Sequence, residues 1–321
     1  MASSVRPLNL VWRRDTLNKV MEAYFIKEVL LGGLKRPVRV IVFDKEEERV
    51  FADDLLIVVR HANPQVNDNV GYLAEARRRG CRNLGVFHVG DEKGEVDLSF
   101  YRDADYVIRN YYVPSAFRVA AAGRPRAVLW APNGYATGVG PRDPMRQLPM
   151  AGRTIVGFFA GYVSGHPDGS ERAEMVRVVQ EHRLPVVLIG TGGFGQGLSP
   201  SEYAGHLENA RFALVPRGNS AETIRLYDAL EAGCIPITLE APYLSAPEAL
   251  GGPPFVILKS WQALPAFLDD YLARIRAGEH DYLEDRRRAV VAWWAGFKTR
   301  QQRRIKAVVD DAFAAATTTV L

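Results

Sequence analysis

The stretch FALVPRGNSAETIRLYDALEAGCIP, residues Phe212–Pro236, decides the fold of this chain. Its apolar start, Phe212–Val215, predicts a strand, and Cys234–Thr238 predicts the next strand. Between them we expect a helix that begins near Ala221 and ends at Gly233, a residue that suits a helix C-terminus. Strand, loop, helix and strand in this order are typical of a parallel α/β sheet.

The loop and first turn of this helix predict an anion site. Asn219 and Ser220 are suitable N-caps, so the helix should turn bare N–H groups toward the loop. Arg225 and Asp228 lie three residues apart and therefore share one helix face. We expect Arg225 to bind a phosphate of a nucleoside diphosphate and Asp228 to bind its ribose hydroxyls.

The same stretch resembles the nucleotide-sugar motif of the exostosin family (glycosyltransferase family 47). That motif is roughly P-R-G, then a serine two residues before an arginine, then E-A-L-x-A-G-C-x-P. The corresponding pieces here are Pro216–Gly218, Thr223-x-Arg225 and Asp228–Pro236, with Thr for Ser and Asp for Glu. The resemblance implies donor binding by Arg217, Gly218, Asn219, Ser220, Thr223, Arg225 and Asp228. The alternative is an ordinary strand–loop–helix unit with a surface Arg–Asp pair.

Bulk properties exclude several other classes. The chain has 321 residues, 41 of them Lys or Arg and 37 Asp or Glu, and its net charge of +4 is too weak to indicate nucleic acid. It is compatible with an anionic nucleotide sugar. Cys81 and Cys234 lack metal or redox spacing, and Cys234 is expected to be a packed thiol. Without a signal peptide or a run of 18 apolar residues, we expect a cytoplasmic protein with no membrane span.

Strands and helices alternate twice along the chain. Strands are predicted at Leu8–Trp12, Val38–Phe43, Leu55–Val59, Leu84–His88, Tyr106–Ile108, Ala127–Trp130, Thr154–Phe159, Pro185–Ile189, Arg211–Val215 and Phe255–Leu258. Helices are predicted at Thr16–Leu31, Asn69–Arg79, Ser170–Glu181, Ser199–Asn209 and from Tyr282 to about Ala315. The Gly- and Pro-rich stretch Pro132–Gly152 has the composition of a linker.

This organisation predicts an acceptor-side α/β domain over residues 1–150 and a nucleotide-sugar-binding α/β domain over 151–280. A helix over 281–321 is expected to cross back to the first domain. The arrangement resembles the GT-B type of glycosyltransferase, in which two Rossmann-like domains face a substrate cleft.

Two further loops of the second domain are candidates for donor binding. Phe158-Phe159-Ala160-Gly161 followed by Arg172 is similar to an F-F-x-G segment and arginine of exostosin-like proteins, which implies that Gly161 and Arg172 contact the donor. The alternative for Arg172 is a surface position in the first helical turn. Gly190–Gly195 reads G-x-G-x-x-G, but no helix opens at once and no acidic residue ends the next strand, so NAD(P) is disfavoured. Gly192 is expected to face the donor instead.

The first domain supplies the candidate base. His88-Val89-Gly90-Asp91-Glu92 and Arg109-Asn110-Tyr111 follow neighbouring predicted strands. They resemble H-x-S-D-E and R-N-Y segments of exostosin-like proteins related to the ribitol xylosyltransferases. We expect Asp91 to deprotonate the acceptor, with Glu92 the next choice and His88 orienting the carboxylate or acting itself. Arg109, Asn110 and Tyr111 are expected on the acceptor side. Alternatively, the acids cap a helix or bind acceptor hydroxyls.

The predicted activity is therefore inverting transfer of a sugar from a UDP-sugar to a glycan hydroxyl, with xylose the favoured sugar. We expect no metal and no cofactor, and we interpret the D-x-D triplet Asp103–Asp105 as surface residues. Two alternatives stay open. A nucleotide-sugar epimerase of the same fold would need no acceptor, and a non-catalytic nucleotide- or glycan-binding module would bind UDP without turnover.

Overall fold

A computed structural model describes residues 6–60, 69–118, 125–163, 170–193, 196–279 and 281–318. The chain forms two compact units, which are described separately here. The first unit consists of Met1–Asn133 with Lys298–Leu321, and the second consists of Gly134–Phe297. The predicted domain limits at residues 150 and 280 stay a prediction.

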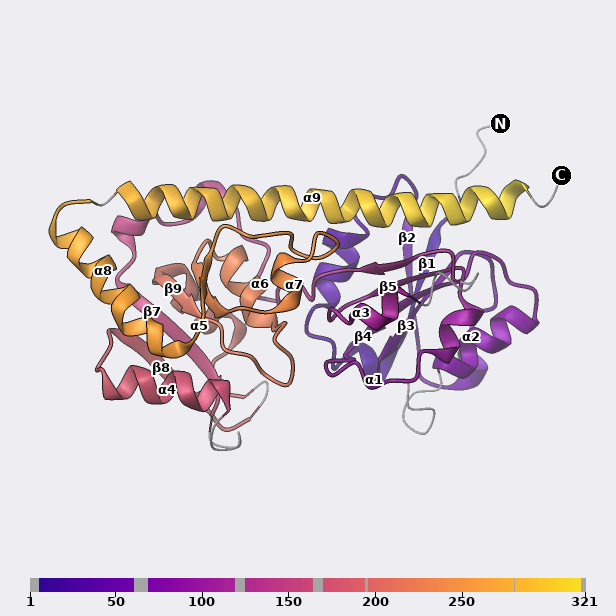
Figure 1. Cartoon of the computed structure of the whole chain (residues 1–321). Coiled ribbons are helices and arrows are strands. Elements are labelled where there is room, and N and C mark those ends of the chain that lie inside the picture. Colours follow the sequence, from indigo (N-terminus) through magenta and orange to yellow (C-terminus); the bar gives the residue numbers. More distant parts are fainter. Residues whose placement is uncertain are drawn as a thin grey trace. The chain divides into compact units, whose positions relative to one another are not determined.

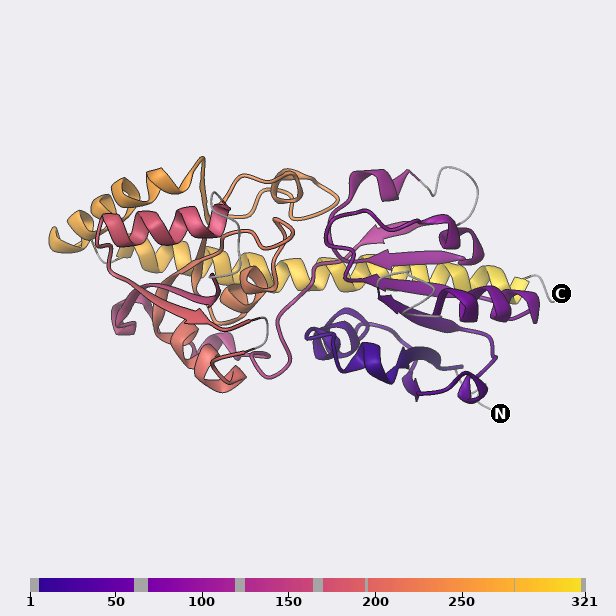
Figure 2. The ribbon, with the colours of Figure 1, turned by 90° about the horizontal axis from the view of Figure 1, so that it is seen from below.

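The first unit is built on a six-stranded sheet of order β2-β1-β3-β4-β5-β6, in which every pairing is parallel. Its strands are β1 (Leu8–Arg13), β2 (Val38–Phe43), β3 (Leu55–Arg60), β4 (Gly85–Val89), β5 (Tyr106–Arg109) and β6 (Val128–Trp130). Several of them are seen side by side in Figure 2. The chain runs from β1 to β2 and then returns to β3 on the other side of β1. The switch in direction, where α/β sheets bind ligands, is therefore at the carboxyl ends of β1 and β3.

Continuous apolar runs form the centre of this sheet. All five residues of Leu55–Val59 are buried, as expected for a parallel strand covered on both faces. The helices of this unit are α1 (Arg14–Leu17), α2 (Asn69–Arg78) and α3 (Pro114–Phe117). Helix α2 contributes Tyr72, Leu73 and Ala76 to the same buried cluster.

The predicted helix Thr16–Leu31 is wrong. Helix α1 ends at Leu17, a turn follows, and Phe25–Leu30 forms a π-helical turn. Phe25 and Leu30 are both buried, five residues apart, and a π turn brings that spacing onto one face where an α-helix does not. Tertiary burial has thus overridden the local helix pattern.

The second unit contains a five-stranded parallel sheet of order β11-β10-β9-β7-β8. Its strands are β7 (Ile155–Tyr162), β8 (Val186–Thr191), β9 (Ala210–Leu214), β10 (Ile235–Leu239) and β11 (Val256–Leu258). Its helices are α4 (Glu171–Glu181), α5 (Pro200–Asn209), α6 (Ile224–Glu231), α7 (Pro242–Ser245) and α8 (Leu264–Arg276). The strand order changes direction between β7 and β9, so this sheet also has a switch point at its carboxyl edge.

The last helix, α9 (Asp281–Thr318), is continuous (Figure 1). Its residues up to Phe297 belong to the second unit and those from Lys298 belong to the first, where Gln302 donates from Nε2 to the carbonyl of Val29 at 2.7 Å. Two parallel α/β units and a last helix that returns to the first confirm the predicted fold class. No described helix is both long enough and apolar enough to cross a membrane.

One sequence interpretation is corrected by burial. Asp105 of the D-x-D triplet is not a surface residue, because it is buried, accepts from the Leu84 N–H at 2.8 Å and pairs with Arg77 at 2.9 Å. The Pro132–Gly152 stretch contains the change from the first unit to the second after Asn133, and Tyr135 and Ala136 within it are buried.

Candidate functional site

Two guanidinium groups meet at the switch point of the second sheet. Arg172, in the first turn of α4, donates to the carbonyl of Tyr162 at 2.6 Å and to the carbonyl of Arg217 at 3.5 Å. Tyr162 is the last residue of β7, and Arg217 lies shortly after the end of β9. Arg225, in the first turn of α6, donates to the carbonyl of Ala160 at 2.9 Å and lies 5.3 Å from the centre of the Phe159 ring. We call Arg172 and Arg225 the arginine pair.

The two guanidinium groups of the arginine pair repel each other. Burial, followed by the positive charge of Arg225, lowers the pKa of Arg172 to about 10, which leaves Arg172 cationic near neutral pH. Arg225 forms no ion pair with a carboxylate in the part of the chain that the structure describes. Two like charges at the start of two helices favour an anion between them.

Glycines allow both guanidinium groups their close approach to the backbone. A methyl group at Gly161 would collide with the guanidinium of Arg225. A methyl group at Gly218 would lie 3.2 Å from Nη2 of Arg172. The structure thus brings together four of the predicted donor residues, Gly161, Arg172, Gly218 and Arg225.

Helix α6 does not begin where the sequence predicts. Its N-cap is Thr223 instead of Asn219 or Ser220, and its first residue is Ile224 instead of Ala221. The Thr223 side chain is 7% exposed, makes no capping bond, and its hydroxyl has no hydrogen-bond partner among the described residues. A buried hydroxyl beside a helix start is a ready donor to an anion.

Asp228 lies on α6 with its carboxylate turned to the backbone. It is buried and accepts from the N–H of Ala136 at 2.8 Å. One turn on, the buried Glu231 accepts from the N–H of Arg142 at 2.9 Å and from the indole of Trp294 at 2.7 Å. These two carboxylates fix residues 136–142 against the helix. The ribose role of Asp228 stays a prediction.

The remaining donor candidates lie at the same sheet edge. Arg217 is exposed, and its N–H donates to Glu171 at 2.9 Å. Asn219 is exposed, and the Ser220 hydroxyl accepts from the N–H of Glu222 at 3.2 Å. Gly192 directly follows β8 and is exposed. Of the G-x-G-x-x-G segment, Phe194 and Gly195 lie outside the described residues.

The predicted base Asp91 forms a buried ion pair in the first unit. Its Oδ2 lies 3.0 Å from Nη2 of Arg109, and the two side chains are 4% and 0% exposed. Its Oδ1 accepts from the N–H of Glu95 at 3.1 Å. His88 is fully buried, with Nδ1 2.7 Å from the hydroxyl of Tyr101. Asp91 and His88 thus each have a buried partner within the protein.

A second group of polar side chains lies at the carboxyl ends of β4 and β5. Asn110 is buried and donates from Nδ2 to Oε1 of Glu22 at 3.0 Å, while its Oδ1 accepts from the N–H of Gly90 at 3.0 Å. The hydroxyl of Tyr111 donates to Oε1 of Glu92 at 3.4 Å. We call Glu22, Glu92, Asn110 and Tyr111 the carboxylate cluster.

Glu22 belongs to this cluster and has a raised pKa. Burial raises its pKa to about 7; the negative charge of Glu92 adds to the rise, and Arg60 and the Asn110 hydrogen bond oppose it. The sequence reasoning missed Glu22, because it placed the residue inside a regular helix. Its position shortly after the first strand, at the edge where α/β sheets bind ligands, was the available signal.

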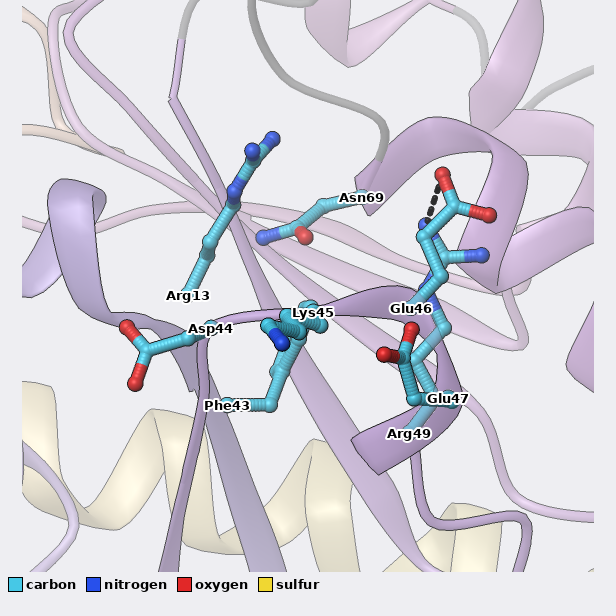
Figure 3. Close-up of a pocket in the computed structure, with 8 residues that line it drawn as sticks. All are labelled: Arg13, Phe43, Asp44, Lys45, Glu46, Glu47, Arg49 and Asn69. Carbon is cyan, nitrogen blue, oxygen red and sulfur yellow. Dashed lines mark ion pairs between the residues drawn. The ribbon is translucent and has the colours of Figure 1, made fainter.

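A pocket of about 290 Å³ lies at the same edge, where β1 and β2 end (Figure 3). It is lined by Arg13, Phe43, Asp44, Lys45, Glu46, Glu47, Arg49 and Asn69. Basic and acidic side chains line it in equal number, so it has no preference for a ligand of one charge. Within the described residues, no group of three or more His, Cys, Asp or Glu side chains is placed to hold a metal.

Two protein-family models match parts of this chain. The model of the Exostosin GT47 domain matches residues 135–250, and that of the RXYLT1 C-terminal domain matches residues 195–314. Ribitol-5-phosphate xylosyltransferase 1 of Danio rerio is 27% identical over 123 residues, which are 35% of this chain and 27% of that protein. The matched region therefore spans only about a quarter of the length of this relative. The resemblance to the exostosin family is confirmed.

Solved structures of similar fold are distant in sequence. One is a Listeria monocytogenes protein described as a UDP-N-acetylglucosamine 2-epimerase. It is 12% identical, with a TM-score of 0.47 over 87% of this chain and 91% of that one. Sucrose-phosphate synthase from Thermosynechococcus elongatus is 13% identical, with a TM-score of 0.47 over 97% of this chain and 100% of that one.

Proposed function

We propose that the chain is an inverting, metal-independent glycosyltransferase that moves a sugar from a UDP-sugar to a glycan hydroxyl. The observation that carries the proposal is the arginine pair, two cations held by backbone carbonyls at the switch point of the second sheet. The match of residues 135–250 to the exostosin domain supports the reaction class. Xylose is our choice of sugar, supported by the match to the RXYLT1 C-terminal domain.

In this proposal the arginine pair binds the diphosphate of the donor. The hydroxyl of Thr223 and the first N–H groups of α6 add uncharged donors at the same place. As the acceptor oxygen attacks the anomeric carbon, the bond to the diphosphate breaks and negative charge grows on the leaving UDP. Fixed donors aimed at that charge lower the barrier, typically by about 2–4 kcal/mol for each charged hydrogen bond.

The acceptor is proposed to bind at the carboxyl edge of the first sheet. The carboxylate cluster supplies groups that can take the proton of an acceptor hydroxyl. The pocket at the ends of β1 and β2, with its balanced charges, suits a ligand that both donates and accepts hydrogen bonds, as sugar hydroxyls do.

A transfer assay tests the proposal. The purified chain is incubated with UDP-xylose or another UDP-sugar, with and without a panel of oligosaccharides and polyols, and with and without EDTA. We expect UDP release that depends on the acceptor, a product of inverted anomeric configuration by NMR, and no loss of activity with EDTA. Release without an acceptor would indicate an epimerase or hydrolase, and UDP binding without turnover would indicate a binding module; either result would contradict the proposal.

A further inference from the structure

The carboxylate cluster contains a catalytic candidate that the motif resemblance does not include. Glu22 lies on the segment after β1, 88 residues from Asn110 in sequence, yet its carboxylate accepts from the Asn110 amide at 3.0 Å. The opposite atom of that amide accepts from the N–H of Gly90. Asn110 thereby fixes one oxygen of Glu22 at the ends of β4 and β5.

The other acidic residues of this edge are less suited to accept a proton. Both oxygens of Asp91 already accept hydrogen bonds, one of them from the buried Arg109. Protonating Asp91 would leave the buried Arg109 charge without its anionic partner, a change that typically costs several kcal/mol. Glu92 already accepts from the Tyr111 hydroxyl and is only partly buried.

We infer that Glu22 is the catalytic base of the transfer, positioned by its hydrogen bond with the Asn110 amide. The inference rests on the proposed function. The acceptor hydroxyl donates its proton to the Glu22 carboxylate while its oxygen forms the new bond to the anomeric carbon. The bond from that carbon to the diphosphate breaks, and its electron pair leaves with UDP. Glu22 becomes a neutral carboxylic acid and later releases the proton to water.

The surroundings of Glu22 match this task. The charged groups that face it are Arg60 at the end of β3 and Glu92 after β4, with the uncharged Asn110 after β5. With a pKa of about 7, it is partly ionised at neutral pH and holds a transferred proton far better than an exposed carboxylate. Glu92 favours the protonated product of the step, because a second negative charge beside the first is unfavourable.

The test is a comparison of Glu22→Gln with wild type. Glutamine keeps an oxygen that can accept from Asn110 but cannot take a proton. We expect turnover to fall at least about a hundredfold, the typical contribution of a general base, while the UDP dissociation constant is unchanged by calorimetry. Glu28→Gln is the matched control, because Glu28 lies six residues on in the same segment, is exposed, and forms an ion pair with the adjacent Lys27. It should behave as wild type.

A pH profile adds a readout that a purely structural role would not move. In wild type, kcat/KM should rise with pH through about 7 as Glu22 ionises. In Glu92→Gln the same rise should occur at lower pH, because the like charge is gone. Turnover of Glu22→Gln within threefold of wild type, or an unshifted rise in Glu92→Gln, would overturn the inference and leave the proposed function intact. A wild type that binds no UDP and transfers no sugar would instead refute the proposed function.

Discussion

The guanidinium groups of Arg172 and Arg225 lie close enough to repel each other, and the charge of Arg225 helps to lower the pKa of Arg172 to about 10. Each is held in place by backbone carbonyls, of Tyr162 and Ala160 respectively, near the end of β7. A protein gains nothing in stability from two cations fixed so near each other. This arrangement is what we expect of a site for a diphosphate, which could accept hydrogen bonds from both groups.

Arg225→Ala removes one of these cations. We expect turnover to fall about a hundredfold or more, because the lost group stabilises charge that develops on the leaving diphosphate. The measurement is steady-state kinetics with the donor that the wild type uses. Arg177→Ala is the control, since Arg177 is an exposed arginine of α4 paired with Glu181. Near-normal turnover of Arg225→Ala would remove this residue from the mechanism.

Gly161→Ala tests the placement of Arg225 without removing a charge. The added methyl group collides with the guanidinium, so we expect weaker UDP binding. Gly190 is its partner in the β7–β8 register, and a methyl group there meets no atom within 4 Å. Calorimetric titration should therefore show reduced affinity for Gly161→Ala and wild-type affinity for Gly190→Ala. Equal affinities in the two variants would contradict the proposed site.

Thr223→Val removes a buried hydroxyl that has no partner among the described residues. The free energy of unfolding should stay the same or increase, because no hydrogen bond within the protein is lost. UDP affinity should fall about tenfold, equivalent to one hydrogen bond of about 1.4 kcal/mol. Thr223→Ser should retain most of the affinity. If valine binds UDP as well as threonine does, the hydroxyl does not contact the ligand.

Asp228→Asn separates ribose binding from a structural role. The amide oxygen can still accept from the N–H of Ala136, so the melting temperature should change little. If Asp228 binds the ribose hydroxyls, UDP affinity should fall about tenfold, because hydrogen bonds to a charged group typically contribute about 1.5–3 kcal/mol. Unchanged affinity, with an intact fold, would assign Asp228 to the packing of residues 136–142.

The raised pKa of Glu22 also predicts how stability depends on pH. The folded carboxyl titrates near 7 and the ordinary carboxyl at 4.5, so the folded state binds its proton more tightly. Wild type should lose stability relative to Glu22→Gln as the pH rises from about 4.5 to about 7. Thermal melting should show the variant more stable at pH 8, with the gap closing below pH 4.5. A constant gap across this range would mean that Glu22 has an ordinary pKa.

Much of the fold could be predicted from local patterns. Apolar runs such as Leu55–Val59 need burial on both faces, and only a parallel sheet with helices supplies it. The start of α6 could not be predicted, because Asn219, Ser220 and Thr223 are all residue types that the capping rule favours. In the structure Glu222 is buried and accepts from the Tyr227 hydroxyl at 2.8 Å, and the extended Thr223 delays the helix.

In the candidate site, too, some residues could be found from local sequence motifs and others only from the tertiary structure. The arginines and glycines of the second sheet lie in two contiguous motifs, so the sequence was sufficient to find Gly161, Arg172, Gly218 and Arg225. Glu22 joins Asn110 only through tertiary structure, and the break after Leu17 that places it there has no local signal such as Gly or Pro. Nor does sequence reveal that Asp91 is paired with a buried arginine.

Calorimetric titration of the wild-type chain with UDP in the presence of EDTA tests the central claim most directly. The account predicts saturable heat from a single site, and a higher melting temperature with UDP, both reduced in Arg172→Ala and in Arg225→Ala. Absence of heat together with an unchanged melting temperature would contradict a diphosphate site at the arginine pair.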